Sequence, residues 1–234
     1  MNIITALVTP FNSDLSVDYN SLSNLIKFQE KSMVDGLLIL GTTSEVFSLT
    51  LQEKMKICTL CFSLFSKTKI IGIEGNTKEK IFNEIDLFKS FNPDYFLITP
   101  PYFNKGNDLG IINYFTSIAD YSPKPIFIYN IPSRSGLNIK INTLKELSKH
   151  KKIAGIKNAS FDKHYNNELS LLNDNDFLVL SGNDETLLEN LVLNNHGLFS
   201  VISNIIPNYV SELSNSYNKN NIKSSNMFKK LMIK

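Results

Sequence analysis

The sequence predicts a closed (β/α)8 barrel, an α/β fold in which eight parallel strands alternate with helices. Three observations favour this TIM barrel. Eight short apolar runs alternate with eight segments of helical periodicity along the 234 residues, and such alternation requires parallel strands with helical crossovers. Eight units in one chain of this length favour a closed barrel. No Gly-x-Gly-x-x-Gly follows the first run, which argues against the alternative, an open doubly wound sheet that binds a dinucleotide.

The predicted strands are short runs of β-branched and other apolar residues. In order they are Ile3–Val8, Gly36–Leu40, Lys69–Ile73, Tyr95–Thr99, Pro125–Tyr129, Ile153–Lys157, Phe177–Ser181 and Gly197–Val201. The predicted helices lie between them because their apolar residues recur at helical spacing. These are Tyr19–Lys31, Leu51–Ser66, Lys78–Ser90, Leu109–Tyr121, Ile141–His150, Tyr165–Leu172, Glu185–Leu193 and Pro207–Tyr217. Residue types that cap helices mark four of the starts: Asp18, Thr50, Thr77 and Asn142.

The segment Asn215–Lys234 has a different composition. It is rich in Asn, Ser and Lys and then becomes amphipathic. We expect residues 1–217 to form the barrel domain and residues 218–234 to begin a C-terminal helical region that is truncated.

Composition excludes several classes of protein. The net charge is only +2, so neither nucleic acid nor an acidic membrane surface is an expected partner. No apolar run reaches the roughly 20 residues that a membrane helix needs, and the N-terminus shows no signal-peptide pattern. Two cysteines are too few for a disulfide framework, which favours the reducing cytoplasm.

The two cysteines, Cys58 and Cys61, form a C-x-x-C within a predicted helix. No second pair exists, and His150, His164 and His196 are scattered. We interpret the thiols as core residues and expect no metal site.

Two predicted strands end on reactive side chains, Tyr129 and Lys157. A lysine that ends an apolar strand is unusual, because ammonium groups are rarely buried. Desolvation lowers a lysine pKa, and a neutral amine attacks carbonyl carbon. The two residues lie one strand–helix unit apart, so we expect them to meet at the C-terminal face of the barrel. A phenol there could shuttle protons during imine formation.

Arg134 lies between them and is the only arginine among 24 basic residues. A chain that otherwise uses lysine suggests that this position needs the planar, bidentate guanidinium group.

Other strand ends add candidate binding groups. Thr42 and Thr43 follow a glycine and offer hydroxyls and backbone N–H groups to a carboxylate. Gly182 follows the seventh strand and permits close ligand approach. Tyr102, beside Phe103, lies on a proline-stiffened loop after the fourth strand.

Three motifs in this order resemble the dihydrodipicolinate synthase / N-acetylneuraminate lyase family over about Ile3–Tyr217. They are G-T-T-S-E after the second strand, Y-N-I-P-S-R-S-G after the fifth and G-I-K-N-A-S at the sixth. The resemblance implies a class I aldolase-type lyase that needs no cofactor, because Lys157 forms a covalent imine with pyruvate. It also implies that Tyr129 shuttles protons with Thr42 as relay partner, that Thr43 holds the pyruvate carboxylate and that Arg134 holds the second substrate's carboxylate.

Within the family, P-S-R-S-G is most similar to the synthase branch, which condenses pyruvate with aspartate semialdehyde in lysine biosynthesis. The resemblance implies a cytoplasmic homo-oligomer, a dimer or tetramer. One alternative is a sialic-acid lyase or a 2-keto-3-deoxy-sugar-acid aldolase, and the other is a non-catalytic truncated remnant.

The sequence departs from the family pattern at several positions. Phe103 stands where the synthases usually have a tyrosine, so either Tyr102 replaces the missing hydroxyl or the proton relay is altered. Glu74 ends the third strand where the family usually has a small residue.

Overall fold

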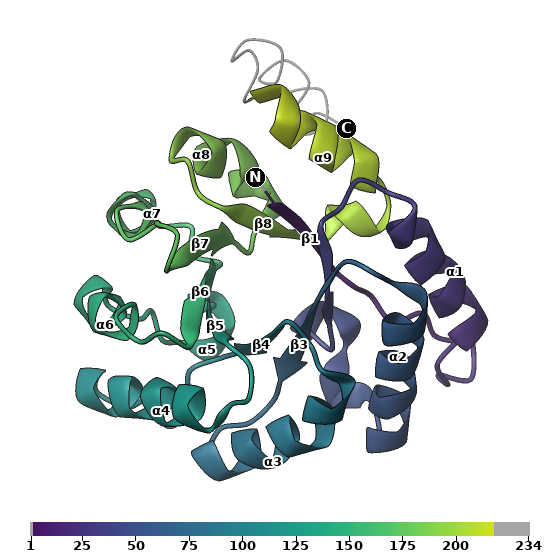
Figure 1. Ribbon diagram of the computed structural model, residues 1–234, viewed down its shortest axis with the longest axis horizontal. Coiled ribbons are helices and arrows are strands. Elements are labelled where there is room, and N and C mark those ends of the chain that lie inside the picture. The colour runs from purple at the N-terminus through teal and green to yellow at the C-terminus, as the bar shows by residue number, and fades with distance from the viewer. Residues whose placement is uncertain (1, 218–234) are drawn as a thin grey trace.

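The computed structural model describes residues 2–217, and these residues form a closed barrel of eight parallel strands in sequence order. Strand β8 pairs with β1 and closes the ring. Helices surround the strands, and β1 and β8 lie side by side where the ring closes (Figure 1). The (β/α)8 prediction is confirmed, and the open sheet is wrong.

The strands are β1 (Asn2–Ala6), β2 (Gly36–Ile39), β3 (Thr68–Ile73), β4 (Tyr95–Ile98), β5 (Ile126–Asn130), β6 (Ile153–Asn158), β7 (Leu178–Ser181) and β8 (Gly197–Ser200). The helices are α1 (Tyr19–Glu30), α2 (Leu51–Leu64), α3 (Lys78–Phe88), α4 (Asp108–Tyr121), α5 (Pro132–Ser135), α6 (Ile141–Leu147), α7 (Lys163–Ser170), α8 (Leu187–Val192) and α9 (Pro207–Tyr217). Five short 3-10 helices complete the described part: η1 (Thr42–Ser44), η2 (Val46–Ser48), η3 (Lys89–Phe91), η4 (Asp184–Thr186) and η5 (Ile202–Asn204).

Three of the four predicted caps are confirmed. The side chains of Asp18, Thr50 and Thr77 accept hydrogen bonds from the first turns of their helices. The prediction for Asn142 is wrong: α6 begins at Ile141, one residue earlier, so Asn142 lies inside the helix.

The core has two layers, as the alternation of strand side chains requires. An inner cluster fills the barrel, and an outer cluster packs the strands against the helices. The inner cluster is made of Ile4, Ala6, Leu38, Ile70, Leu97, Phe127, Tyr129, Ile131, Ala159, Leu180 and Phe199. The interior of the barrel is therefore filled with side chains, and a binding site can form only at the ends of the strands.

Strand β6 contains a bulge. Ile126 of β5 pairs with Ile153, but the next residue, Phe127, pairs with Gly155, so β6 has one extra residue there. Ile153 and Ile156 both belong to the outer cluster, although residues three apart in a regular strand face opposite sides. The bulge therefore shifts the alternation of the rest of β6 by one residue.

Glycine is required at the bulge. Gly155 has a φ of +155°, and a Cβ atom there would lie 2.0 Å from the carbonyl oxygen of Leu178. Beyond the bulge, Lys157 pairs with Tyr129 of β5. The two reactive side chains are thus neighbours on adjacent strands.

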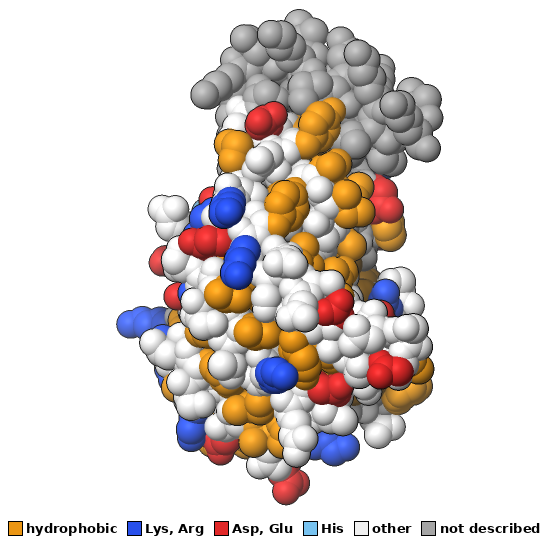
Figure 2. Space-filling model, turned by 90° about the vertical axis from the view of Figure 1, so that its right-hand side faces the viewer, with side chains coloured by type: hydrophobic (Ala, Val, Ile, Leu, Met, Phe, Trp, Pro, Cys, Tyr) orange, Lys and Arg blue, Asp and Glu red, His pale blue; other side chains and the backbone are white. Residues whose placement is uncertain are grey.

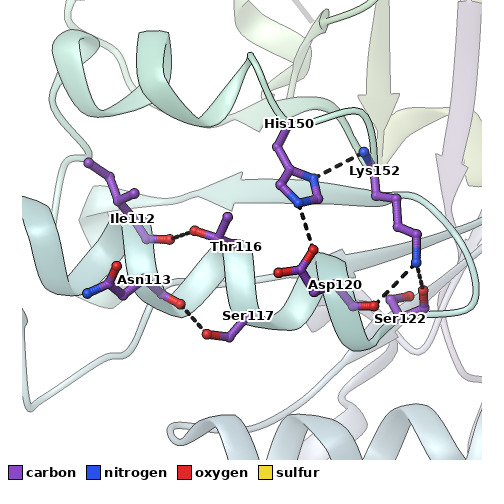
Figure 3. A network of polar contacts seen from close by, with 8 residues as sticks. All are labelled: Ile112, Asn113, Thr116, Ser117, Asp120, Ser122, His150 and Lys152. Carbon is purple, nitrogen blue, oxygen red and sulfur yellow. Dashed lines mark hydrogen bonds and ion pairs between the residues drawn. The ribbon is translucent and has the colours of Figure 1, made fainter.

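A polar network anchors the start of β6 to α4 at the end of the barrel opposite the strand ends that carry the site (Figure 3). The backbone N–H of Lys152 donates to Nδ1 of His150, 3.2 Å away, so the proton of this imidazole is on Nε2, which lies 3.1 Å from Oδ1 of Asp120. The Lys152 ammonium donates to the backbone oxygens of Asp120 and Ser122 at the end of α4. A cation at this position satisfies carbonyl groups that the helix leaves unpaired.

The surface shows no segregation of charge on the side that carries α1, α2 and α9, where Lys and acidic side chains are scattered among apolar ones (Figure 2). No helix within residues 2–217 is long and apolar enough to span a membrane. The predicted helical region at residues 218–234 lies outside the described residues and stays a prediction.

Candidate active site

The site residues predicted from sequence lie at or just after the carboxyl ends of strands, on one face of the barrel. Thr42 and Thr43 form η1 after β2, and Tyr102 follows β4. The remaining four are Tyr129 in β5, Arg134 in α5, Lys157 in β6 and Gly182 after β7.

Lys157 is buried inside the barrel mouth, with only 3% of its surface exposed. Its Nζ lies 4.1 Å from the centre of the Tyr129 ring and 5.1 Å from that of Phe199. Burial lowers the pKa of the Lys157 amine from 10.5 to about 7, because the apolar surroundings disfavour its charged form. A large fraction of this amine is therefore neutral near pH 7 and able to attack a carbonyl carbon.

Two charged neighbours adjust this pKa in opposite directions. The positive charge of Arg134 lowers the Lys157 pKa further, and the carboxylate of Asp184 raises it. Asp184 is held by the backbone N–H groups of Val201 and Ile202, 2.9 and 3.1 Å from its Oδ2. Arg134 is itself exposed at the rim, so its guanidinium group is free to face an incoming anion.

The Tyr129 ring lies beside the Lys157 amine, and its hydroxyl is hydrogen-bonded to Thr42. Its phenol is 5% exposed, and burial raises its pKa, while a side-chain hydrogen bond with Thr42 and the charge of Arg134 lower it. The phenol is thus protonated near pH 7 and linked to a second hydroxyl. A phenol that lies beside an amine and is hydrogen-bonded to a threonine hydroxyl is suited to moving a proton during carbonyl chemistry.

A chain of amide hydrogen bonds fixes the ends of β5 and β6. Asn130 Nδ2 donates to Oδ1 of Asn138 at 2.7 Å and to Oδ1 of Asn158 at 2.9 Å. Asn158 donates to Asn166 at 2.7 Å, and Asn166 donates to Glu189 at 3.0 Å. Asn130 and Asn158 directly follow the phenol and the amine in sequence. The two reactive groups therefore sit on strand ends that are held together from the outer side.

A cavity opens beside the Tyr129 phenol. Most of its wall is apolar, and its polar side chains are those of Thr42, Glu74, Thr99, Tyr102 and Tyr129. The lining residues are Leu40, Gly41, Thr42, Val46, Phe47, Gly72, Ile73, Glu74, Gly75, Leu97, Thr99, Tyr102 and Tyr129. The structure thus brings Thr42, Tyr102 and Tyr129 around one space.

Gly182 lies against the aliphatic part of the Lys157 side chain. A Cβ atom at this position would lie 3.0 Å from Cε of Lys157 and 3.1 Å from Cβ of Ala159. Gly182 also borders a second, mainly apolar groove that includes Val201 and Ile205. Thr43 follows Thr42 in η1 and is half-buried.

Three residues around the site were not singled out from the sequence. Asp184 carried a signal, since it follows Gly182 closely after a strand. No feature of the sequence pointed to Phe199, because an aromatic residue inside a predicted strand is expected in the hydrophobic core. Lys54 lies in the middle of α2, and its ion pair with Glu74 depends on the barrel bringing α2 beside β3.

The cysteine pair lies away from this site. Cys58 and Cys61 are buried in α2, and burial raises the pKa of Cys58 to about 12. Inert thiols of this kind fit the predicted core role. Within residues 2–217, no group of three or more His, Cys, Asp or Glu side chains is arranged to hold a metal ion.

Comparison with known proteins gives a consistent result. The model of the dihydrodipicolinate synthetase family matches residues 1–233. The 4-hydroxy-tetrahydrodipicolinate synthase of Brachyspira hyodysenteriae is 36% identical over 206 residues, which cover 86% of this chain and 69% of that protein. The crystal structure of dihydrodipicolinate synthase from Thermotoga maritima has a TM-score of 0.93 at 28% identity, covering 99% of this chain and 80% of that chain. A monomeric dihydrodipicolinate synthase variant also has a TM-score of 0.93, at 28% identity, with 99% and 79% of the two chains covered.

Proposed function

Because this chain belongs to the dihydrodipicolinate synthetase family and is a lyase of the class I aldolase type, we propose that it joins pyruvate to an aldehyde through an imine on Lys157. The proposed aldehyde is aspartate semialdehyde, which makes the chain a 4-hydroxy-tetrahydrodipicolinate synthase of lysine biosynthesis. The observation that carries the proposal is the buried Lys157 amine, whose pKa is lowered to about 7 beside the Tyr129 phenol.

The proposed chemistry starts at this amine. Its neutral Nζ adds to the carbonyl carbon of pyruvate. The carbonyl oxygen takes up two protons, one from the attacking nitrogen and one from solvent, and leaves as water, which gives the iminium form of the imine. The iminium draws electrons from the adjacent methyl group, which loses a proton, and the resulting enamine carbon attacks the aldehyde carbon. The amine itself supplies the electrophilic activation, so this route requires neither a metal nor an organic cofactor.

The neighbours of the amine take the remaining roles. Tyr129 carries protons to and from the reacting oxygen, with Thr42 as its relay partner, which their hydrogen bond supports. Thr43 and the adjacent backbone N–H groups hold the pyruvate carboxylate. Gly182 leaves room for pyruvate next to the Lys157 side chain.

The second substrate would bind between Arg134 and the cavity that Tyr102 lines. Arg134 at the rim holds its carboxylate through the bidentate guanidinium group. The mainly apolar wall of the cavity favours a short aldehyde over a polyhydroxylated sugar acid, because a sugar chain needs a polar partner for each hydroxyl. This supports the synthase reaction over a sialic-acid lyase or a 2-keto-3-deoxy-sugar-acid aldolase.

A homo-oligomer in the cytoplasm is also part of the proposal. Phe103 is 87% exposed and Phe47 is 68% exposed, and contact with a second copy would remove these large apolar side chains from water. Both follow strand ends on the same face of the barrel as the site.

The imine is tested by reduction with borohydride in the presence of pyruvate. We expect a mass increase equal to pyruvate minus water plus two hydrogens, on the peptide that contains Lys157. The Lys157→Met variant should show no adduct, whereas Lys152→Met, which removes an amine at the opposite end of β6, should react like the original protein. An unmodified Lys157 under these conditions would contradict the proposal.

A substrate panel then separates the alternatives. Turnover of aspartate semialdehyde with pyruvate, without cleavage of sugar acids, is the expected result. Cleavage of a sugar acid alone would favour the aldolase alternative, and an adduct without any turnover would favour the remnant.

A further inference from the structure

Glu74 is a carboxylate in the active-site cavity to which the reaction described above gives no role. It follows β3 and lines the same cavity as Thr42, Tyr102 and Tyr129. Its Oε2 accepts a hydrogen bond from Nζ of Lys54 at 2.9 Å, and the two side chains are only 18% and 11% exposed. A charge therefore lies in the cavity wall, partly neutralised from behind by helix α2.

The other oxygen of this carboxylate has no donor. Oε1 of Glu74 is buried and accepts no hydrogen bond from any described residue. Buried polar atoms are almost always paired, and an unpaired oxygen of a charged group is the costliest exception. No donor of the described residues offsets the charge on this side of the carboxylate, and a positively charged donor bound in the neighbouring cavity would stabilise it.

The charges around Glu74 indicate which donor fits. Glu84 is a second carboxylate nearby; burial and the charge of Glu74 raise its pKa, and Lys54 lowers it. Lys54 is thus the cation that Glu74 and Glu84 share. The surroundings of Glu74 therefore favour binding of a second positive group. The β5–β6 side of the site carries the positive charge of Arg134, which lowers the affinity of that side for cations.

The site is therefore polarised, with the Glu74 carboxylate after β3 and the Arg134 guanidinium group in α5, after β5. We propose that Glu74 determines the specificity for the second substrate: its negative charge in the cavity wall attracts the ammonium group of an amino-acid aldehyde whose carboxylate is held by Arg134. The inference rests on the proposed function and deepens it. The competing explanation is that the Lys54–Glu74 pair only fastens α2 to β3.

The test compares two unreactive analogues of equal chain length, a hydroxy acid with an α-ammonium group and the same acid without it. Their inhibition constants are measured with the original protein and with Glu74→Gln, which keeps the shape but removes the charge. We expect the original protein to prefer the ammonium-bearing analogue at least tenfold and the variant to lose this preference. The KM for the aldehyde should rise tenfold or more, while the KM for pyruvate changes less than twofold.

Removing Glu74 leaves the buried Lys54 without its partner, so the single variant could be unstable. The double variant Lys54→Met with Glu74→Gln removes both charges of the ion pair and should show the same loss of preference. Glu79→Gln, a change at an exposed carboxylate in the first turn of α3, is the matched control and should keep the preference.

The outcomes separate this inference from the function on which it rests. If pyruvate is trapped on Lys157 but the ammonium preference is equal in the original protein and both variants, the pair is only structural and the inference is wrong. If no adduct forms on Lys157, the proposed function itself fails.

Discussion

Two charged side chains, Arg134 and Asp184, act on the Lys157 amine in opposite senses. Burial brings the pKa of this amine to about 7, Arg134 lowers it and Asp184 raises it. Because only the neutral amine attacks a carbonyl group, the rate of imine formation should rise with pH through about 7 and level off above it.

Changing the two neighbours should move this pH profile in opposite directions. Arg134→Met removes a positive charge, so the pKa of Lys157 rises and the midpoint of imine formation moves to higher pH. Asp184→Asn removes a negative charge, so the midpoint moves to lower pH. Borohydride trapping of pyruvate measured from pH 5 to pH 10, as rough limits that bracket the shifted pKa, reports both midpoints.

Arg134→Lys provides the control because it keeps the charge. Its midpoint should stay near that of the original protein, whereas its KM for the aldehyde should rise through loss of the bidentate contact. Shifts of the same sign in Arg134→Met and Asp184→Asn would contradict this electrostatic account.

Much of the residue-scale chemistry could be predicted from the sequence. Tyr129 and Lys157 stood out because reactive side chains end apolar strands, and their proximity is confirmed by the pairing of β5 with β6. The influence of Asp184 could not be predicted, because it depends on a loop conformation that Val201 and Ile202 fix from the next strand–helix unit. The roles of the site residues remain predictions.

At the scale of elements, β6 and the turn after β7 determine where the amine lies. Both contain a glycine at a point of close approach, but the contacts differ. At Gly155 the neighbour is the backbone of Leu178, which cannot move without breaking β7, and at Gly182 it is the flexible side chain of Lys157.

The two glycines should therefore respond differently to replacement by alanine. Gly182→Ala places a Cβ atom 3.0 Å from Cε of Lys157 and so pushes this side chain aside slightly. We expect imine formation to fall, by less than the roughly 100-fold that a misplacement on the order of 1 Å causes, with little change in melting temperature. Gly155→Ala inserts a methyl group into the β6–β7 ladder and should lower the melting temperature sharply or prevent folding. Activity assays and thermal unfolding of both variants check this, and equal loss of stability in the two would contradict it.

The number and order of the eight strands, and of the eight helices that alternate with them, could be predicted. Short apolar runs and segments of helical periodicity alternate along the chain. The short helix α5 was missed because it comprises only the four residues Pro132–Ser135, too few for a periodic pattern. The start of α6 was misplaced because Asn142 has a capping side chain but lies one residue inside the helix.

At the scale of the whole molecule, the closed barrel leaves several large apolar side chains exposed on the face that carries the site. Phe103 is 87% exposed and adopts a positive φ of +64°, which costs free energy for a residue with a side chain. We therefore expect this residue to contact another copy of the chain.

Phe103→Asp should shift the protein toward smaller species in sedimentation velocity experiments, because a charge at an apolar contact is strongly unfavourable. Leu171→Asp is the control: Leu171 is 83% exposed but follows α7 at the opposite end of the barrel, and its change should leave the sedimentation unaltered. An unchanged sedimentation coefficient for Phe103→Asp would show that Phe103 makes no such contact.

Closure of the ring could be predicted from the eight units, since the pairing of β1 with β8 follows once all eight are present. How copies of the chain associate, and in what number, could not be predicted. In a sequence, an exposed residue such as Phe103 cannot be told from any other loop residue.

The extra residue in β6 has a consequence for how sharply this chemistry depends on the chain. The side chains of a strand point alternately into the barrel and out toward the helices. Adding or removing one residue therefore moves every side chain beyond that point to the other face. Without the bulge in β6, Ile156 would point into the barrel, and Lys157 would point outward into the apolar cluster between the strands and the helices. The barrel could still close in that arrangement, but Lys157 would not face the site. The presence or absence of one residue in β6 therefore decides whether the proposed chemistry is possible.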